Sequence, residues 1–235
     1  MNKTVLITGG GKRTGAALCR AFARAGWQVL IHCNHSRAEA EVLAETLRAS
    51  GAVVCVLQYD LRDAGAVDAL MEQCGSLDAL INNASTYRRI ALDALDEDSL
   101  REDYEVNFFA PFRLMREFAK RCIADGGVII NLLDQRIAKL DAGSAGYSLA
   151  KMALADATRM CALAWAPRKI RVNGIAPGYI APPYGVPMSA MQRHIDATPL
   201  RCRTTEEQVA NAALFLVDNP EITGEIIYLD GGLHL

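Results

Sequence analysis

The chain has 235 residues, of which 51% are hydrophobic, and this length and composition suit a single domain with a substantial core. Its formal net charge is −2 and no run reaches the ~18 apolar residues of a membrane span, so neither a nucleic-acid nor a membrane partner is expected. The start of the chain resembles no leader, and the seven scattered cysteines form no C-x-x-C pair, so we expect a cytoplasmic protein with reduced core thiols.

Strand and helix patterns alternate along the chain. Continuous Val, Ile and Leu runs predict strands at 4–8, 29–33, 53–59, 79–82, 128–133, 171–176 and 225–230. Helical patterns lie between them at 17–26, 37–49, 63–74, 97–124, 148–166 and 206–217. Strands that are apolar throughout are typical of parallel sheets covered on both faces. The pattern therefore predicts an α/β fold over residues 1–235, one doubly wound, Rossmann-type domain whose mostly parallel seven-stranded sheet carries helices on both faces.

The segment 177–203 interrupts this alternation. It holds five of the eight prolines, and only 189–197 has a helical pattern. A connection of this length in a compact domain usually has a function, so we expect a substrate lid, with a surface insertion as the alternative.

A glycine-rich turn, TGGGKRTG at 8–15, follows the first strand and opens the first helix. Glycines let the backbone approach a pyrophosphate closely, and the start of the helix offers N–H donors and the positive end of its dipole. A dinucleotide is therefore expected to bind at Gly9, Lys12, Arg13, Thr14 and Gly15. The alternative is a turn that is merely tight.

The end of the second strand favours NADPH over NADH. An NAD enzyme typically places an acid here for the ribose 2′-hydroxyl, but HCNHSR at 32–37 has no acid before Glu39. Groups that suit a 2′-phosphate are present instead, namely Lys12, Asn34, His35, Ser36 and Arg37. Ser36 is also expected to cap the helix at 37–49, with Glu39 as its capping-box partner. Arg37 could alternatively lie on a solvated helix face.

Polar residues also follow the third and fourth strands. Asp60 comes directly after the third strand and could accept a hydrogen bond from the adenine amine. The segment NNAS at 82–85 follows the fourth strand and brings Asn83, Ala84 and Ser85 to the carboxyl edge of the sheet, where open α/β sheets bind ligands.

Together these segments resemble the short-chain dehydrogenase/reductase family over essentially the whole chain. The matching segments are TGGGKRTG, Asp60-Leu61, NNAS, Asn107 in VNFFAPF, Tyr147 and Lys151 in YSLAK, RVNGIAPG at 171–178 and TGEIIYLDGG at 223–232. The resemblance implies that Leu61, Pro177 and Gly178 also bind the cofactor. It further implies that Lys151 binds the nicotinamide ribose and that Asn107 holds a water in a proton relay.

Two departures from the common family pattern point to one subgroup. Arg13 stands where the turn usually has a further glycine, and Asp134 stands where a catalytic serine is usual, thirteen residues before Tyr147. Both features resemble the pteridine reductases and the bacterial dihydromonapterin reductases, as does the ending DGGLHL at 230–235. An aromatic residue after NNAS, here Tyr87, is also typical of that subgroup, although it could be an ordinary loop residue.

Tyr147 and Lys151 lie one helical turn apart and so share a helix face. A free phenol has a pKa of ~10, and we expect the ammonium of Lys151 and the positive ring of NADP⁺ to lower the pKa of Tyr147. Tyr147 would then serve as a general acid near neutral pH.

Asp134 favours reduction of a C=N bond over reduction of a ketone. A carboxylate would repel the negative charge that grows on a ketone oxygen, but it could relay a proton to Tyr147 or accept from ring N–H donors of a pterin. The expected pterin site comprises Arg13, Ser85, Tyr87, Asp134 and Tyr147. Alternatively Asp134 is only a turn residue and a neighbour such as Ser144 replaces the serine.

These features predict an NADPH-dependent reductase of a dihydropterin of the dihydromonapterin, dihydrobiopterin or dihydrofolate type. The alternatives are a carbonyl reductase, for instance of 3-oxoacyl thioesters, and a non-catalytic NADPH-binding sensor. The four histidines show no metal-ligand spacing, so no metal site is expected. The helix at 148–166 is apolar around most of its circumference, and with the resemblance it predicts a homotetramer.

Overall fold

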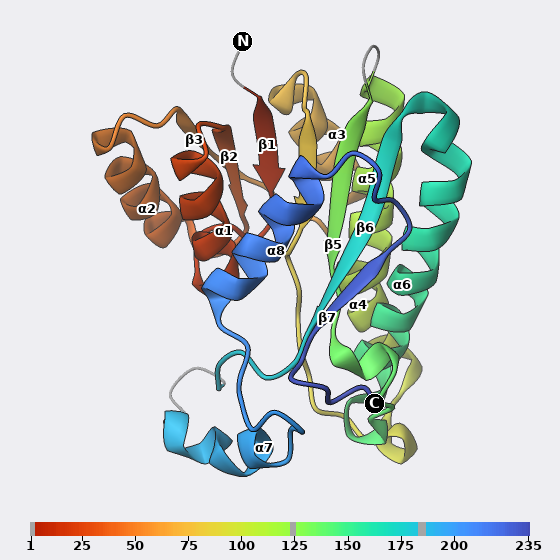
Figure 1. Cartoon of the computed structure of the whole chain (residues 1–235). Coiled ribbons are helices and arrows are strands. Elements are labelled where there is room, and N and C mark those ends of the chain that lie inside the picture. Colours follow the sequence, from red (N-terminus) through yellow and green to blue (C-terminus); the bar gives the residue numbers. More distant parts are fainter. Residues whose placement is uncertain (1–2, 123–125, 183–186) are drawn as a thin grey trace.

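The computed structural model describes residues 3–122, 126–182 and 187–235. Its seven strands form one sheet in the order β3-β2-β1-β4-β5-β6-β7, and every neighbouring pair is parallel (Figure 1). The strands are β1 (Thr4–Ile7), β2 (Gln28–Cys33), β3 (Val54–Gln58), β4 (Ala79–Asn82), β5 (Gly127–Leu132), β6 (Ile170–Pro177) and β7 (Ile226–Leu229). The predicted α/β fold is confirmed. The strand order reverses between β1 and β4, where doubly wound sheets form a crevice at the strands' carboxyl ends.

Helices cover both faces of this sheet. They are α1 (Arg13–Arg24), α2 (Arg37–Ala49), α3 (Ala64–Cys74), α4 (Glu97–Tyr104), α5 (Ala110–Arg121), α6 (Ala145–Trp165), α7 (Gln192–Asp196) and α8 (Glu206–Asp218). Residues of α1, α2 and α8 form one apolar core with the sheet, and residues of α3, α5 and α6 form the other. Successive strand residues alternate between the two cores, since Val5 and Ile7 join the first and Leu6 joins the second. Both faces are therefore buried, which explains the unbroken apolar runs.

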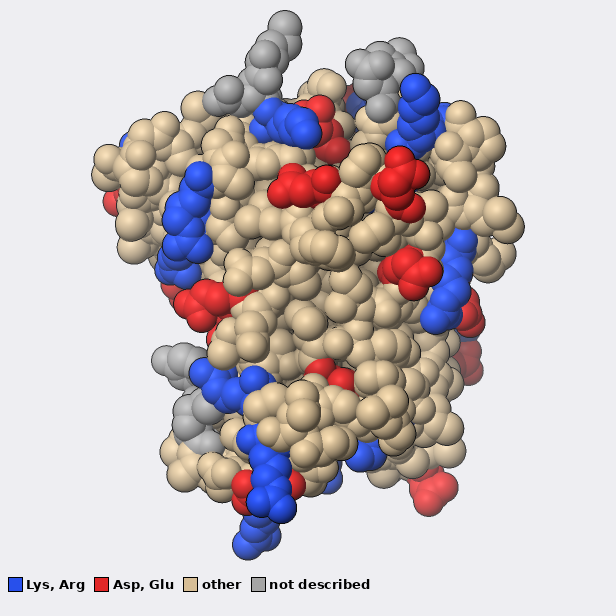
Figure 2. All heavy atoms as spheres, viewed as in Figure 1, with Lys and Arg blue, Asp and Glu red and all other residues tan. Residues whose placement is uncertain are grey.

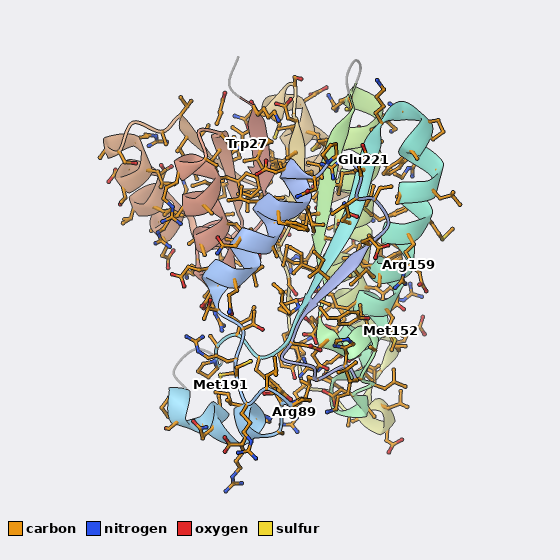
Figure 3. All side chains as sticks on the ribbon, viewed as in Figure 1. Trp27, Arg89, Met152, Arg159, Met191 and Glu221 are labelled. Atoms are coloured by element: carbon orange, nitrogen blue, oxygen red, sulfur yellow. The ribbon has the colours of Figure 1, made fainter. Side chains whose placement is uncertain are left out.

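The carboxyl ends of the strands lie at one end of the molecule. In Figure 1 this is the lower end, where α7 and the C-terminus also lie, while the N-terminus lies at the opposite end. Figure 3 places Arg89 and Met191 at the lower end and Trp27 and Glu221 at the opposite one. In Figure 2 positive and negative side chains are interspersed over this view of the molecule. None of the described helices is long and apolar enough to cross a membrane.

The predicted helical region 97–124 is divided in the structure. It consists of α4, a π-helical turn at Glu105–Phe109, and α5, and its last residues, 123 and 124, lie outside the described residues. The first helix begins at Arg13 rather than at 17, because its opening turn is the glycine-rich segment itself. The segment predicted as helical at 189–197 forms a 3₁₀ turn at Met188–Met191 and then the short α7.

The predicted capping box at Ser36 is wrong. Ser36 has φ −99° and ψ 40°, outside the extended conformation of an N-cap, and its side chain makes no capping hydrogen bond. Glu39, the expected partner, pairs instead with Lys12 at 2.6 Å. A capping box does form at the start of α8, between Thr205 and Gln208.

The expectation that all seven cysteines are core thiols is also wrong. Cys19, Cys33, Cys74 and Cys161 are buried and Cys122 is partly buried, whereas Cys55 and Cys202 are exposed. Cys55 lies on β3, the first strand in the sheet order, and an edge strand is covered less completely than a central one.

Candidate active site

Tyr147, Lys151 and Asp134 meet where β5 ends and α6 begins. The phenol of Tyr147 donates a hydrogen bond of 3.0 Å to Oδ2 of Asp134. Lys151, one turn further along α6, donates from Nζ to the carbonyl of Leu132 at 2.7 Å, and its Nζ lies 5.8 Å from the centre of the Tyr147 ring. Tyr147 is 7% exposed and Lys151 2%. The three residues expected to handle the proton therefore lie together, with Tyr147 and Lys151 buried and Asp134 partly buried.

Burial dominates the electrostatics of this group. It lowers the pKa of Lys151 to about 8, an effect that the nearby Asp134 carboxylate opposes. It also raises the pKa of Tyr147 well above its ordinary value, and the negative charge of Asp134 raises it further. In the chain without its cofactor the pKa of Tyr147 is therefore raised rather than lowered, because burial and the carboxylate outweigh the opposing effects of the Arg136 guanidinium and the Ser85 hydroxyl.

Asp134 has a second role as the residue that begins a 3₁₀ turn at Gln135–Ile137. Its Oδ1 accepts from the backbone N–H of Arg136 at 2.9 Å, as in the turn-residue alternative. The two readings are compatible, since Oδ2 of the same carboxylate faces Tyr147. The rival Ser144 is buried, but its hydroxyl donates to Asp141 at 2.8 Å and contacts Ser148 at 3.4 Å. Ser144 therefore does not replace the usual serine in the described hydrogen bonds.

Tyr87 lies beside Tyr147, as the pterin-site prediction requires. The two rings are 5.0 Å apart and meet edge to face at 88°. Tyr87 remains 49% exposed, so part of the ring is available to a ligand. The guanidinium of Arg136 lies 5.3 Å from the centre of the Tyr87 ring. Sequence reasoning missed Arg136, although its place two residues after Asp134 was a signal for a local ion pair.

Asn107 lies in the π-helical turn and is completely buried. Its amide donates to the carbonyls of Asp103 and Thr86, both at 3.0 Å, and its Oδ1 accepts from the hydroxyl of Ser85 at 2.6 Å. Ser85 follows β4, so this bond connects the NNAS segment to the helical layer. Isolated π-helical turns are frequent at functional sites. The Asn107 side chain is thus held in place, and any water that it positions would have to bind its backbone.

The glycine-rich turn is packed too closely for side chains at Gly9 and Gly15. Gly9 has φ +62°, and a Cβ there would lie 3.0 Å from the Cα of Ala84. A Cβ on Gly15 would overlap the carbonyl oxygen of Gly9 and lie 2.8 Å from the Cα of Gly10. Arg13 also has a positive φ, of 49°, so it keeps a backbone conformation that favours the glycine usual there. Its guanidinium donates to the carbonyls of Ala181 and Pro182, at 2.9 and 3.1 Å.

The residues expected to bind the 2′-phosphate gather beside this turn. The Ser36 hydroxyl lies 3.0 Å from where a Cβ on Gly11 would be, and Lys12 is the N-cap residue of α1, whose side chain makes no capping hydrogen bond. Arg37 is exposed and donates to Gln58 at 3.2 Å, and Gln58 in turn donates to the carbonyl of Asn34 at 2.7 Å. His35 is exposed and Thr14 partly buried. Lys12 and Arg37 are partly neutralised by Glu39 and Glu41.

Five other expected cofactor residues lie at or just after the ends of strands. Asn83 donates to the carbonyls of Thr8 and Gly9, at 2.9 and 3.1 Å, so its amide holds the glycine turn rather than facing outward. Leu61 is buried in the core. Gly178 follows β6 and its N–H donates to Leu229 at 2.8 Å, which places Pro177 and Gly178 at the carboxyl edge of the sheet. Asp60 also lies at that edge, after β3.

Asp60 is already paired within the chain. Both of its oxygens accept from the guanidinium of Arg62 at 3.0 Å, and this partner holds the pKa of Asp60 at about 2. The carboxylate is therefore ionised and can accept a further hydrogen bond. Among the residues that the structure describes, no three His, Cys, Asp or Glu side chains lie close enough together to hold a metal ion.

His32 is a second residue that sequence reasoning missed. Its Nδ1 accepts from the N–H of Gly9 at 3.2 Å and its Nε2 faces the carbonyl of Tyr59 at 3.0 Å. Burial lowers its pKa to about 4, so the ring is neutral and carries its proton on Nε2. His32 thus ties the glycine turn to the end of β3. A polar residue inside the apolar run of the second strand was the available signal.

Known proteins resemble this chain over nearly its whole length. A family model described as enoyl-(acyl carrier protein) reductase matches residues 13–234. FolM alternative dihydrofolate reductase 1 from Brucella canis, solved in complex with NADP, superimposes with a TM-score of 0.93 at 36% identity, covering 99% of this chain and 94% of that one. Pteridine reductase 1 of Leishmania tarentolae is 31% identical, over 98% of this chain and 96% of that protein.

A second kind of relative also matches over the full length. The 3-oxoacyl-(acyl-carrier-protein) reductase FabG of Staphylococcus aureus is 28% identical, over 100% of this chain and 99% of that protein. All of these matches extend from the glycine turn to the C-terminal segment. The chain therefore belongs to the short-chain dehydrogenase/reductase family, within which it falls in the pteridine reductase-like group.

Proposed function

We propose that this protein reduces the C=N bond of a dihydropterin to give the tetrahydro form, with NADPH as the reductant. The observation that carries the proposal is the carboxylate of Asp134, 3.0 Å from the phenol oxygen of Tyr147. A ketone reductase needs a neutral donor at this place, because negative charge grows on the substrate oxygen. A dihydropterin instead presents N–H donors, which a carboxylate can accept.

The cofactor site fits NADPH by its shape and its charge. Gly9 and Gly15 leave room for the pyrophosphate backbone, and the start of α1 directs unpaired N–H groups toward it. Lys12, Ser36 and Arg37 supply donors for a 2′-phosphate. The proteins named FolM were solved in complex with NADP, which supports the same cofactor here. We further propose the cofactor residues of the sequence analysis, with Asn83 and Leu61 acting through the structure of the turn.

Different residues of the chain would donate the proton, stabilise the charge that remains and bind the pterin. NADPH, when bound, supplies the hydride to the carbon of the C=N bond. Tyr147 donates its phenolic proton to the nitrogen, which receives the electron pair of the broken π bond. Lys151 holds positive charge 5.8 Å from the ring centre and so favours the phenolate that remains. Asp134 accepts hydrogen bonds from the pterin, and Tyr87, Ser85 and Arg13 complete the proposed pterin site.

One other activity is supported by a specific observation. The FabG relative covers the full chain, so reduction of a 3-oxoacyl thioester is the second candidate. Asp134 opposes it, because the carboxylate would repel the developing oxyanion. The third candidate, a cofactor-binding sensor without catalysis, would leave the group of Tyr147, Lys151 and Asp134 without a catalytic role.

We also propose that 177–203 covers the substrate and that the protein is a homotetramer. Part of the lid, 183–186, lies outside the described residues. On α6 the side chains of Met160 and Leu163 are 70% and 83% exposed, and Leu149 is 41% exposed. An outward row of apolar side chains on a long helix suits burial against a second copy.

An NADPH-oxidation assay tests the proposed function. The purified protein would be supplied in turn with dihydromonapterin, dihydrobiopterin, dihydrofolate and a 3-oxoacyl thioester, with cofactor binding measured separately. We expect turnover with at least one dihydropterin and a much lower kcat/KM with the thioester. Preference for the thioester would support the second candidate, and NADPH binding without any turnover would support the sensor.

A further inference from the structure

Arg136 contacts two residues of the proposed pterin site. Its Nη1 donates to both oxygens of Asp134, at 3.1 and 3.0 Å, and its backbone N–H donates to Oδ1 of the same carboxylate. Its guanidinium also lies 5.3 Å from the centre of the Tyr87 ring, which packs edge to face against Tyr147. The Arg136 side chain is 16% exposed and Asp134 15%, so solvent screens this pair little.

A second carboxylate fixes the orientation of the guanidinium. Nε of Arg136 donates to Oδ2 of Asp141 at 2.9 Å, and Asp141 is itself held by the N–H of Gly143 and the hydroxyl of Ser144. A planar guanidinium bound to two carboxylates has little freedom to rotate. The fixed guanidinium of Arg136 therefore orients both the Asp134 carboxylate and the Tyr87 ring.

The charges around Asp134 come from three elements. Tyr147 and Lys151 face it from α6, Arg136 and Asp141 from the segment between β5 and α6, and Tyr87 lies beyond Arg136. Lys151 is buried and directs its ammonium to the carbonyl of Leu132. Arg136 is the cation that donates directly to the Asp134 carboxylate among the described residues.

We propose that Arg136 is a positioning residue of this reductase, which orients the Asp134 carboxylate toward Tyr147 and holds the Tyr87 ring against Tyr147. The inference rests on the proposed function, because it assigns Asp134 the task of accepting hydrogen bonds from the pterin. An Asp134 side chain turned away from Tyr147 would no longer meet those donors. A displaced Tyr87 would no longer offer its ring to the flat substrate.

The test compares Arg136→Gln and Arg136→Lys with a matched control, Arg121→Gln. Arg121 ends α5 at the opposite edge of the sheet and pairs with Glu117, so its variant loses an ion pair away from the site. KM for a dihydropterin, kcat and the affinity for NADPH are measured for each variant. In Arg136→Gln, KM for the dihydropterin should rise severalfold while the NADPH affinity stays at the wild-type value, because Asp134 and Tyr87 lose the group that orients them. The control should keep the wild-type KM.

The lysine variant separates charge from geometry. Lysine keeps the positive charge but lacks the planar fork that binds both Asp134 and Asp141, so KM for the pterin should rise severalfold in this variant too. If Arg136→Gln does not fold, this variant carries the test. A wild-type KM in either variant would overturn the proposal.

A substrate-free measurement distinguishes failure of this inference from failure of the proposed function. The ring of Tyr87 lies 5.0 Å from that of Tyr147, so its ring current shifts the aromatic proton resonances of Tyr147. These resonances, assigned by their absence in Tyr147→Phe, are compared in the wild type and in Arg136→Gln. A changed shift in the variant supports the role of Arg136 even if no pterin is reduced. An unchanged shift refutes that role even if pterin turnover is high.

Discussion

The phenol oxygen of Tyr147 donates its proton to Oδ2 of Asp134 across 3.0 Å. A tyrosine–serine pair presents a neutral hydroxyl to the substrate, whereas this pair presents the negative charge of the Asp134 carboxylate. At 4 Å, two negative charges repel by about 4 kcal/mol when the effective dielectric constant is 20. A repulsion of this order between Asp134 and a forming oxyanion would slow ketone reduction about a thousandfold. The contact therefore favours a substrate whose reacting atom is a nitrogen that gains a proton.

Activity should fall as the pH rises through about 8. Burial lowers the pKa of Lys151 to about 8, so its ammonium, which favours the Tyr147 phenolate, is lost above that pH. The basic limb of kcat/KM should therefore lie near pH 8. A profile that stays flat to pH 10 would contradict this assignment.

Loss of folding does not account for this fall in activity. The contribution of Lys151 to the free energy of unfolding changes with pH in the opposite direction. The pKa of a free lysine is about 10.4, so between pH 8 and that value the unfolded chain binds more protons than the native chain. The Lys151 contribution to the free energy of unfolding therefore rises with pH over this window. Denaturant unfolding at pH 7 and 9, in the wild type and in Lys151→Met, separates this contribution from those of other groups.

NADPH should be preferred over NADH, and Arg37 should carry part of the preference. Arg37 is exposed and its contact with Glu41 is loose, at 3.6 Å, so its guanidinium is available to a 2′-phosphate. A hydrogen bond to a charged group contributes about 1.5–3 kcal/mol, so Arg37→Ala should weaken NADPH binding roughly ten- to a hundredfold and leave NADH binding unchanged. Arg24→Ala, at the other end of α1, is the control. Equal use of both cofactors by the wild type would refute the preference.

Gly15→Ala should damage the cofactor site. The added methyl group would overlap the Gly9 carbonyl and press on Gly10, and both are backbone groups that cannot move aside singly. Overpacking of this kind costs about 1–3 kcal/mol, so we expect a lower melting temperature and NADPH binding weakened at least tenfold. Gly65→Ala on α3 is the matched control, because its Cβ would make only an ordinary contact with Asp63, at 3.4 Å. Normal NADPH affinity in Gly15→Ala would show that the turn has more room than its geometry indicates.

Leu163→Glu should break the proposed tetramer. Leu163 is 83% exposed on α6, and a charge buried there in an interface would be unpaired. Light scattering should give a tetramer for the wild type and a smaller species for the variant. Val42→Glu, on an equally apolar but unrelated exposed position of α2, should remain a tetramer. A wild-type monomer at micromolar concentration would end this proposal.

Strand positions could be predicted well because burial on both faces leaves a strong signal. The strand at 79–82 and the helix at 37–49 coincide with the structure, since each is bounded by polar or turn-forming residues. The helix cap at Ser36 could not be predicted in the same way. A serine followed by Glu39 fits a capping box, but Lys12, distant in sequence, binds Glu39 instead.

In the active site, too, some features could be predicted from the sequence and others could not. Helical spacing placed Tyr147 and Lys151 on one face, and the resemblance to the reductase family placed Asp134 beside them. The partners of these residues depend on side-chain directions that spacing does not encode. The fork of Arg136 between Asp134 and Asp141 and the two hydrogen bonds of His32 are therefore visible only in the structure. The same holds for the raised pKa of Tyr147, which follows from burial.

Replacing Asp134 by serine tests most directly whether the carboxylate selects the chemistry. The measurement is kcat/KM for a dihydropterin and for a simple ketone in the wild type and in Asp134→Ser, with NADPH affinity as the control for folding. We expect pterin turnover to fall about 10²–10⁴-fold, the usual contribution of acid–base groups, while NADPH still binds and any ketone activity increases. Asp134→Asn, which keeps the shape but not the charge, should also fail. An Asp134→Ser variant that reduces the dihydropterin as fast as the wild type would contradict the account.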